Sequence, residues 1–97
     1  MRINPEQREG SFLVMDDIWY VYIIECRDDK LYVGIAKDVE ARVKLHNKGS
    51  ACRFTKYRYP VQLLYKERYI SKSLARKREI ELKRFSRKKK FDVIQKV

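Results

Sequence analysis

Tyr22 and Tyr32, ten residues apart, are the side chains in this sequence best suited to act together in chemistry. Arg42 follows ten residues after Tyr32, and His46, the single histidine of the chain, follows four residues after Arg42. A phenol or an imidazole can exchange protons with a substrate, and a guanidinium can bind phosphate oxygens through two parallel hydrogen bonds. Together with a carboxylate that binds a metal ion, these groups would form a site that cleaves phosphodiester bonds.

Each of these residues also has a purely structural interpretation. Tyr22 and Tyr32 fit ordinary aromatic neighbours on a hairpin, and their spacing alone favours that reading. Arg42 fits a side chain that extends from the edge of the core, and His46 fits a buried structural histidine. A free phenol has a pKa near 10, so its ionisation at neutral pH costs roughly 4 kcal/mol. A catalytic Tyr22 would therefore need neighbouring cations that lower its pKa.

The composition favours a single domain with a polyanionic partner. The chain has 97 residues and carries 24 lysines and arginines against 13 acidic residues. The formal charge of +11 favours nucleic acid ahead of an anionic membrane surface. No apolar stretch approaches the roughly 20 residues that span a bilayer, and residues 1–14 lack the apolar core of a signal peptide. Cys26 and Cys52 form no CxxC pair, which favours reduced thiols in a cytoplasmic protein.

A flexible tail at residues 1–17 is predicted to precede one domain at residues 18–97. Residues 18–26 are rich in β-branched and aromatic side chains on both faces, which predicts a central strand covered on two sides. A turn at residues 28–30 leads to a second strand at residues 31–35. The resulting hairpin is expected to bring the two phenols side by side.

Helices and one further strand are predicted after this hairpin. Asp38 is a suitable N-cap for a helix on which Arg42 and His46 lie one turn apart. The predicted elements are this helix at 39–47, a strand at 61–69, a helix from Ser71 or Ser73 to about Phe85, and a final helix that Ser86 caps, with Phe91, Ile94 and Val97 as its buried side. The order β-β-α-β-α-α indicates an α/β layer arrangement.

Glu79 and Glu81 in the second long helix are the candidate carboxylates. They lie on opposite edges of its apolar stripe, so periodicity does not separate a metal ligand from a surface partner of the neighbouring basic residues. One carboxylate is enough for magnesium, which keeps several waters and binds phosphate oxygens. Tyr57 and Tyr59 fit stacking on unpaired bases and core positions equally well. The basic residues predicted to contact a nucleic-acid backbone are Lys37, Lys44, Lys56, Arg58, Arg87 and Lys88.

These motifs, taken in order, resemble the GIY-YIG endonuclease domain in its small, single-domain bacterial form. The resemblance covers residues 18–94. Its first motif corresponds to Tyr20-Val21-Tyr22 and its second to Tyr32-Val33-Gly34. The helix with Arg42 and His46 has the family's Arg-x-x-x-His pattern.

The sequence departs from the family pattern at four places, of which Val33 in place of isoleucine in the second motif is a minor one. Tyr20 replaces the glycine that gives the family its name, as in the small branch. Ala36 stands where a hydroxyl residue is common. No asparagine follows Asn47, so the function of the late asparagine that some relatives have near the site is either missing here or taken over by Ser86 or Lys88.

The resemblance implies an α/β (α+β) fold in which a small antiparallel three-stranded sheet is flanked by helices. It also implies a role for each site residue. Tyr22 would accept the proton of the attacking water, and Tyr32 would position the water or the phosphate. Arg42 would stabilise the phosphate, and His46 would assist near the tyrosines. Glu79, rather than the other glutamate, would bind Mg²⁺ or Mn²⁺.

The implied function is a metal-dependent endonuclease that hydrolyses phosphodiester bonds in DNA. Structural rather than long-sequence specificity, a role in DNA repair and a protein partner for targeting fit this function. The alternative function is a non-catalytic, basic nucleic-acid-binding module, which would bind in a salt-sensitive manner without cleavage. The complete set of candidate residues favours the enzyme, because a module that had lost catalysis would be expected to lack at least one of them.

Overall fold

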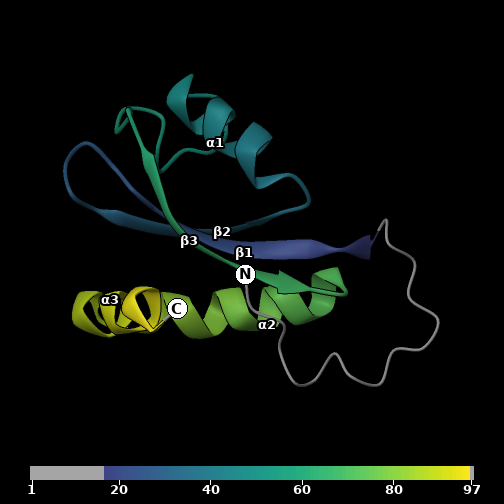
Figure 1. Cartoon of the computed structure of the whole chain (residues 1–97). Coiled ribbons are helices and arrows are strands. Elements are labelled where there is room, and N and C mark those ends of the chain that lie inside the picture. The colour runs from purple at the N-terminus through teal and green to yellow at the C-terminus, as the bar shows by residue number, and fades with distance from the viewer. Residues whose placement is uncertain (1–16, 97) are drawn as a thin grey trace.

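Strand β1 (Trp19–Glu25) lies between β2 (Leu31–Ala36) and β3 (Gln62–Tyr69) in a three-stranded antiparallel sheet (Figure 1). The computed structural model describes residues 17–96. Apart from Asp17, the tail predicted at 1–17 lies outside these residues. The predicted fold class and the element order β-β-α-β-α-α are confirmed.

The helices are α1 (Val39–Asn47), α2 (Lys72–Lys83) and α3 (Arg87–Gln95). Figure 1 shows α1 on one side of the sheet and the other two helices on the opposite side. None of the helices between residues 17 and 96 is long and apolar enough to cross a membrane.

Strand β1 is covered on both faces, as its sequence predicts. Val21 and Ile23 pack into a core with Leu82 of α2 on one side of the sheet. Tyr22 and Ile24 pack into a second core on the other side, which includes the first residue of α1. Because successive side chains of a strand point to opposite faces, one apolar strand supports both layers.

Side-chain oxygens begin each helix. Asp38 accepts a hydrogen bond from the backbone of Ala41 at 3.0 Å, as predicted. Ser71, rather than Ser73, caps α2. Ser86 caps α3 through the backbone of Lys89, so its hydroxyl is engaged within the helix start.

The predicted buried side of α3 is confirmed only in part. Val93 is the buried residue of this helix, and Ile94 is half-buried against the same core. Phe91 is also half-buried. The guanidinium of Arg87 lies 5.0 Å from the centre of the Phe91 ring, so this ring sits at the surface edge of the helix. Val97, the third predicted residue, lies outside the described residues.

A partly buried ion pair fixes the rotation of α2 against β3. Arg78 donates from Nε and Nη2 to the two oxygens of Glu67, at 3.0 and 3.1 Å. The hydroxyls of Tyr65 and Tyr69 donate to the same carboxylate. Successive residues of a helix lie about 100° apart, so Glu79, the residue after Arg78, points to a different side of α2.

Candidate active site

The hairpin brings the two phenols together on the face that α1 covers. Tyr22 is paired with Gly34 in the ladder, and Tyr32 is paired with Ile24. The centroids of the two phenol rings are 6.4 Å apart. A Cβ atom at Gly34 would lie only 2.6 Å from the hydroxyl oxygen of Tyr22, so the glycine provides the space in which this phenol lies.

His46 connects α1 to the tyrosines. Its Nε2 atom is 2.8 Å from the hydroxyl of Tyr22, and its ring centroid is 5.3 Å from that of Tyr32. The side chain is 1% exposed. Burial, assisted by the positive charge of Arg42, lowers the pKa of His46 to about 4. The imidazole is therefore neutral at physiological pH.

Both tyrosines are held in the phenol form. Burial, together with the neighbouring Tyr32, raises the pKa of Tyr22 above its usual value of 10, although the charge of Arg42 opposes this shift. Burial and a hydrogen bond with Cys52 raise the pKa of Tyr32 to about 12. The expectation that cations lower the pKa of Tyr22 is not met in the free protein, because burial outweighs the charge of Arg42.

Arg42 is half-buried and lies one turn before His46 on α1. Its charge acts on the pKa values of Tyr22 and His46, so the guanidinium lies within electrostatic range of these side chains. Within residues 17–96, this guanidinium makes no ion pair or hydrogen bond. It is therefore available to bind a phosphate.

Glu79 approaches the tyrosines from α2. It lies 3.2 Å from the ammonium of Lys83, which in turn lies 5.8 Å from the ring centre of Tyr32. Its negative charge acts on the pKa values of both tyrosines. Glu81 is largely exposed and pairs with Arg78. The structure thus separates the two glutamates that periodicity leaves equivalent.

The carboxylate of Glu79 fits a role as a metal ligand. The residue is 5% exposed, and its Oε1 atom has no hydrogen-bond partner among residues 17–96. Arg76 places a nitrogen 3.2 Å from that oxygen, but outside hydrogen-bond geometry. The described residues contain no group of three metal-binding side chains. A single buried carboxylate suits Mg²⁺, which completes its coordination with water and phosphate oxygens.

Comparison with known proteins decides the family. A model of the GIY-YIG catalytic domain matches residues 18–92. The chain belongs to the GIY-YIG family. It is 51% identical over 78 residues to the UPF0213 protein SSP2268 of Staphylococcus saprophyticus, covering 80% of this chain and 95% of the relative. The UPF0213 protein SAV0488 of Staphylococcus aureus matches with the same identity and coverage.

A solved structure supports the same assignment. The solution NMR structure of the UPF0213 protein BH0048 from Bacillus halodurans is 38% identical, with a TM-score of 0.52. The match covers 79% of this chain and 82% of that one. GIY-YIG membership implies a nuclease-type hydrolase that acts on nucleic acid, and GIY-YIG nucleases generally use divalent metal ions. Residues 18–92 thus form a small GIY-YIG domain.

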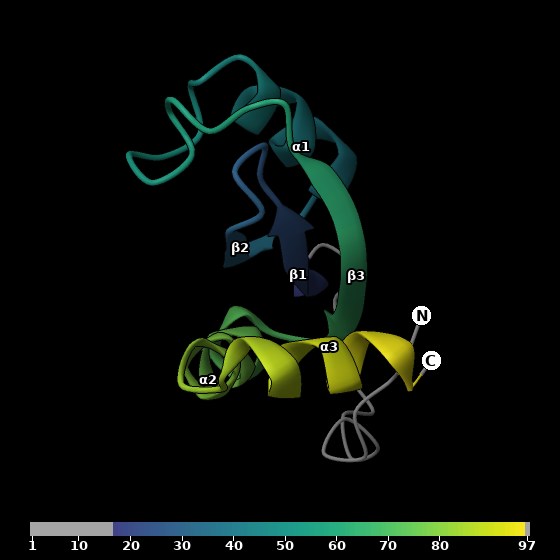
Figure 2. The ribbon, with the colours of Figure 1, turned by 90° about the vertical axis from the view of Figure 1, so that its left-hand side faces the viewer.

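The loop between α1 and β3 adds to the candidate site three residues that sequence reasoning missed. Thr55 is fully buried, and its Oγ1 atom lies 2.6 Å from Nδ1 of His46. Cys52 lies 3.4 Å from the same hydroxyl. Phe54 stacks on Tyr32 with a centroid distance of 5.7 Å. Loop residues have no periodicity, so only the folded chain reveals these contacts. Figure 2 shows this loop and α2 on the side of the sheet where β2 lies.

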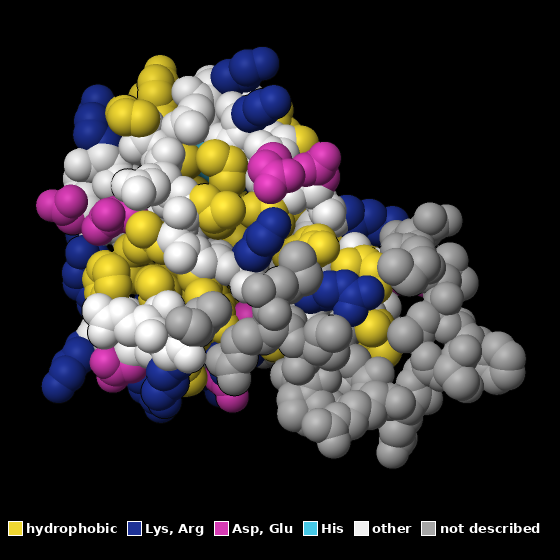
Figure 3. Space-filling model, in the orientation of Figure 1, with side chains coloured by type: hydrophobic (Ala, Val, Ile, Leu, Met, Phe, Trp, Pro, Cys, Tyr) yellow, Lys and Arg dark blue, Asp and Glu magenta, His cyan; other side chains and the backbone are white. Residues whose placement is uncertain are grey.

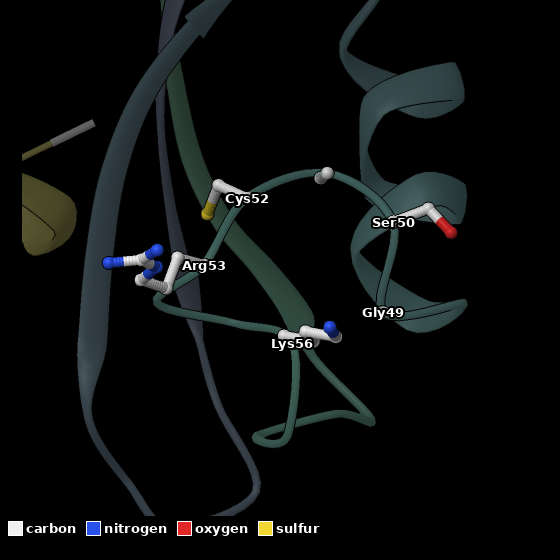
Figure 4. Close-up of a pocket in the computed structure, with 6 residues that line it drawn as sticks. Gly49, Ser50, Cys52, Arg53 and Lys56 are labelled. Carbon is white, nitrogen blue, oxygen red and sulfur yellow. The ribbon is translucent and has the colours of Figure 1, made fainter.

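The same loop also curves around a shallow pocket of about 300 Å³. Residues 49–53 and Lys56 line it (Figure 4). Arg53 and Ser50 extend from the loop in opposite directions in Figure 4, so the polar side chains do not converge on a ligand. The candidate site therefore remains the group around Tyr22.

The lysines predicted to contact nucleic acid are exposed, while the two predicted arginines form ion pairs with acidic residues at or near the β1–β2 turn. Arg58 pairs with Asp28 at 3.0 Å, and Arg87 lies 3.6 Å from Glu25 at the end of β1. Tyr57 is 76% exposed, which rules out a core position. The exposed lysines are Lys37, Lys44, Lys56 and Lys88.

Basic side chains are spread over the surface. On the face drawn in Figure 3, lysine and arginine side chains lie around a centre of hydrophobic side chains, with acidic side chains among them. Tyr59 is also exposed, at 41%. The charge of the chain therefore does not form one continuous patch on that face.

The buried histidine makes stability depend on pH in a defined window. The pKa of His46 in the folded protein, about 4, lies below its usual value of 6.5, so the unfolded chain binds this proton at higher pH. The resulting stability is complete above pH 6.5 and is lost as the pH falls toward 4. We expect the free energy of unfolding to decrease by about 2 kcal/mol between about pH 7 and about pH 5, measured by urea unfolding.

Glu67 and the variant His46→Gln separate the contribution of His46 to the pH dependence of stability from that of other groups. Burial raises the pKa of Glu67, but hydrogen bonds from Arg78 outweigh burial and hold that pKa below its usual 4.5, so this carboxyl titrates below the window. His46→Gln should remove the pH dependence between about pH 7 and about pH 5. A wild-type stability that is constant over this range would contradict a buried, neutral His46.

Proposed function

We propose that this chain is a metal-dependent endonuclease that hydrolyses phosphodiester bonds in DNA, with Mg²⁺ or Mn²⁺ as its cofactor. The observation that carries this proposal is the meeting of five side chains from four elements. Tyr22 comes from β1, Tyr32 from β2, Arg42 and His46 from α1, and Glu79 from α2. No pair of these residues is adjacent in the sequence. A purely structural role does not require a base, a phosphate-binding group and a buried carboxylate in one place.

The reaction is an in-line attack of water on the scissile phosphorus, which breaks the bond to the 3′ oxygen; this oxygen leaves and takes up a proton from solvent. Tyr22 passes its phenolic proton to Nε2 of His46, and the resulting tyrosinate accepts the proton of the water. Tyr32, which is more exposed, positions the water or the phosphate. Arg42 neutralises charge that develops on the phosphoryl oxygens. Glu79 would hold the metal ion, which supplies positive charge to the phosphate when it is bound.

The acidity of Tyr22 sets a condition on this reaction. Its pKa in the free protein lies above 10, so a tyrosinate at neutral pH costs more than roughly 4 kcal/mol. The positive charge of the metal ion, present when the substrate is bound, must lower the free-energy cost of ionising Tyr22. We therefore expect the phenol to act only when substrate and metal are present.

The exposed lysines favour contacts with the phosphate backbone of DNA. Such contacts would select the structure of the DNA and not a long base sequence. The exposed lysines Lys37, Lys44, Lys56 and Lys88 carry charge that binds phosphates. Contacts to phosphates position a nucleic acid but carry no sequence information directly. Sequence-independent binding would thus leave a junction, branch or unpaired region as the feature that selects the substrate.

Tyr22→Phe tests the proposed function. We expect the wild type to nick supercoiled and branched DNA when Mg²⁺ is present, and the variant to cleave at least about a hundredfold more slowly. Tyr65→Phe is the matched control, because it removes a buried hydroxyl from the opposite face of the sheet. DNA binding that is sensitive to salt, without cleavage under any divalent metal, would instead support the non-catalytic binding module.

A further inference from the structure

Thr55 lies behind the tyrosines, in a position that neither a helix nor a strand provides. It belongs to the loop between α1 and β3 and is 0% exposed. Its hydroxyl oxygen is 2.6 Å from Nδ1 of His46 and 3.4 Å from the sulfur of Cys52. The other ring nitrogen of His46 is 2.8 Å from the hydroxyl of Tyr22. These four side chains form a continuous hydrogen-bonded chain inside the protein.

A neutral imidazole has one N–H group, so two arrangements of hydrogen atoms are possible along this chain. In the first arrangement, Nδ1–H of His46 donates to Thr55 and Nε2 accepts from the phenol of Tyr22. In the second arrangement, Thr55 donates to Nδ1 and Nε2–H donates to the phenol oxygen. The two arrangements differ in where the hydrogen of the phenol points.

Only the first arrangement gives every buried hydrogen an acceptor. Tyr22 is 1% exposed, and His46 is the only hydrogen-bond partner of its hydroxyl among residues 17–96. The second arrangement would leave the phenolic hydrogen of Tyr22 without an acceptor, which costs about 1–3 kcal/mol. The first arrangement also leaves the hydroxyl hydrogen of Thr55 free to point at the sulfur of Cys52.

The acidity of Cys52 agrees with this direction. Burial raises the pKa of the thiol, but hydrogen bonds from Thr55, from the side chain of Tyr32 and from the backbone of Phe54 outweigh burial, and the net shift is downward. A hydroxyl lowers the pKa of a thiol when it donates to the sulfur and stabilises the thiolate. A Thr55 hydroxyl that accepts from His46 and donates to Cys52 agrees with this shift.

We propose that Thr55 is a positioning residue that holds His46 in the tautomer with hydrogen on Nδ1, so that Nε2 accepts the phenolic hydrogen of Tyr22. With its hydrogen directed at Nε2 of His46, the phenol can pass this proton to the imidazole, and the resulting tyrosinate oxygen accepts the proton of an attacking water. The tautomer part of this proposal concerns the free protein. Its consequence for cleavage rests on the proposed nuclease function.

The tautomer is measured on the free protein, without substrate or metal. His46 is the single histidine of the chain, so the ring signals of a ¹⁵N-labelled sample need no assignment. Long-range ¹H–¹⁵N spectra at neutral pH are expected to show Nδ1 protonated and Nε2 unprotonated. Wild-type spectra with the hydrogen on Nε2 would overturn the proposal, whatever the activity of the protein.

Two substitutions at Thr55 separate the hydroxyl from the volume of the side chain. Thr55→Val keeps the shape but removes the acceptor, so the Nδ1–H tautomer should lose its preference. Thr55→Ser keeps the hydroxyl and should retain the wild-type tautomer. An unchanged tautomer in the folded valine variant would overturn the proposal. If the valine variant does not fold, the wild-type and serine spectra still decide the outcome.

Cleavage provides the second readout. Thr55→Val should lower kcat by at least about tenfold with little change in KM, because the residue orients a catalytic group and does not touch the substrate. Thr55→Ser should restore most of the rate. An equal kcat in the valine variant and the wild type would overturn the catalytic consequence. A wild type that does not cleave would reject the proposed function, while the ring spectra would still test the tautomer.

Discussion

Glu79→Gln is expected to abolish metal-dependent cleavage while the fold stays intact. Glutamine has nearly the same shape, but it lacks the charge that holds a divalent cation. The rate of DNA nicking should fall by about a hundredfold or more, comparable to the loss of one strong electrostatic contact in other active sites. Titration of the free protein with Mn²⁺, followed by its paramagnetic signal, should show the loss of the bound ion independently of activity.

Stability should change little in this variant. The cations next to Glu79 are Arg76 and Lys83, whose side chains are 63% and 51% exposed, so removing their partner strands no buried charge. Exposed ion pairs contribute about 0–1 kcal/mol each. The free energy of unfolding of Glu79→Gln should therefore stay within about 1 kcal/mol of the wild type.

Glu81→Gln is the matched control on the same helix. Glu81 is largely exposed and pairs with Arg78, which also binds Glu67 of β3. This variant should cleave DNA and bind Mn²⁺ as the wild type does. Equal cleavage by Glu79→Gln and the wild type would remove Glu79 from the site, and a loss in both variants would indicate a general charge effect.

The contrast between these two glutamates shows what periodicity can and cannot predict. The apolar stripe of α2 correctly identifies its buried face, with Ala75 and Leu82 fully buried. Both glutamates flank that stripe, and their burial differs because Arg78 is anchored to Glu67 of β3. A contact between residues that are eleven positions apart, on two elements, is not encoded in the spacing within one helix.

The strands and caps were predictable because they depend on neighbouring residues. The two apolar faces of β1 and the Asp38 cap follow from local composition and spacing. The contacts of Thr55 depend instead on how the loop after α1 folds back over β2. The protonation of Tyr22 was also not predictable, because burial raises a pKa and the extent of burial is a property of the folded chain.

Gly34→Ala should damage both stability and cleavage, although it adds one methyl group. The added Cβ would lie 2.6 Å from the hydroxyl oxygen of Tyr22 and 2.9 Å from a ring carbon of Tyr32. Neither ring can move freely, since Tyr22 is bound to His46 and Phe54 stacks on Tyr32. Overpacking of this kind costs about 1–3 kcal/mol, which thermal unfolding should detect as a decrease in Tm of about 4–8 °C per kcal/mol.

A double-mutant cycle with Tyr22→Leu identifies the cause of this loss. Leucine lacks the phenol ring, so the methyl group of Gly34→Ala should cost less in the leucine background, with a coupling of at least about 1 kcal/mol. Because Gly34 carries no functional group, its effect on cleavage can arise only through the phenols that it displaces. Additive changes in the free energy of unfolding would show that Gly34 does not shape the site through Tyr22. A coupled loss of stability and rate would show that the glycine of the second motif is retained for the space it leaves to the first tyrosine.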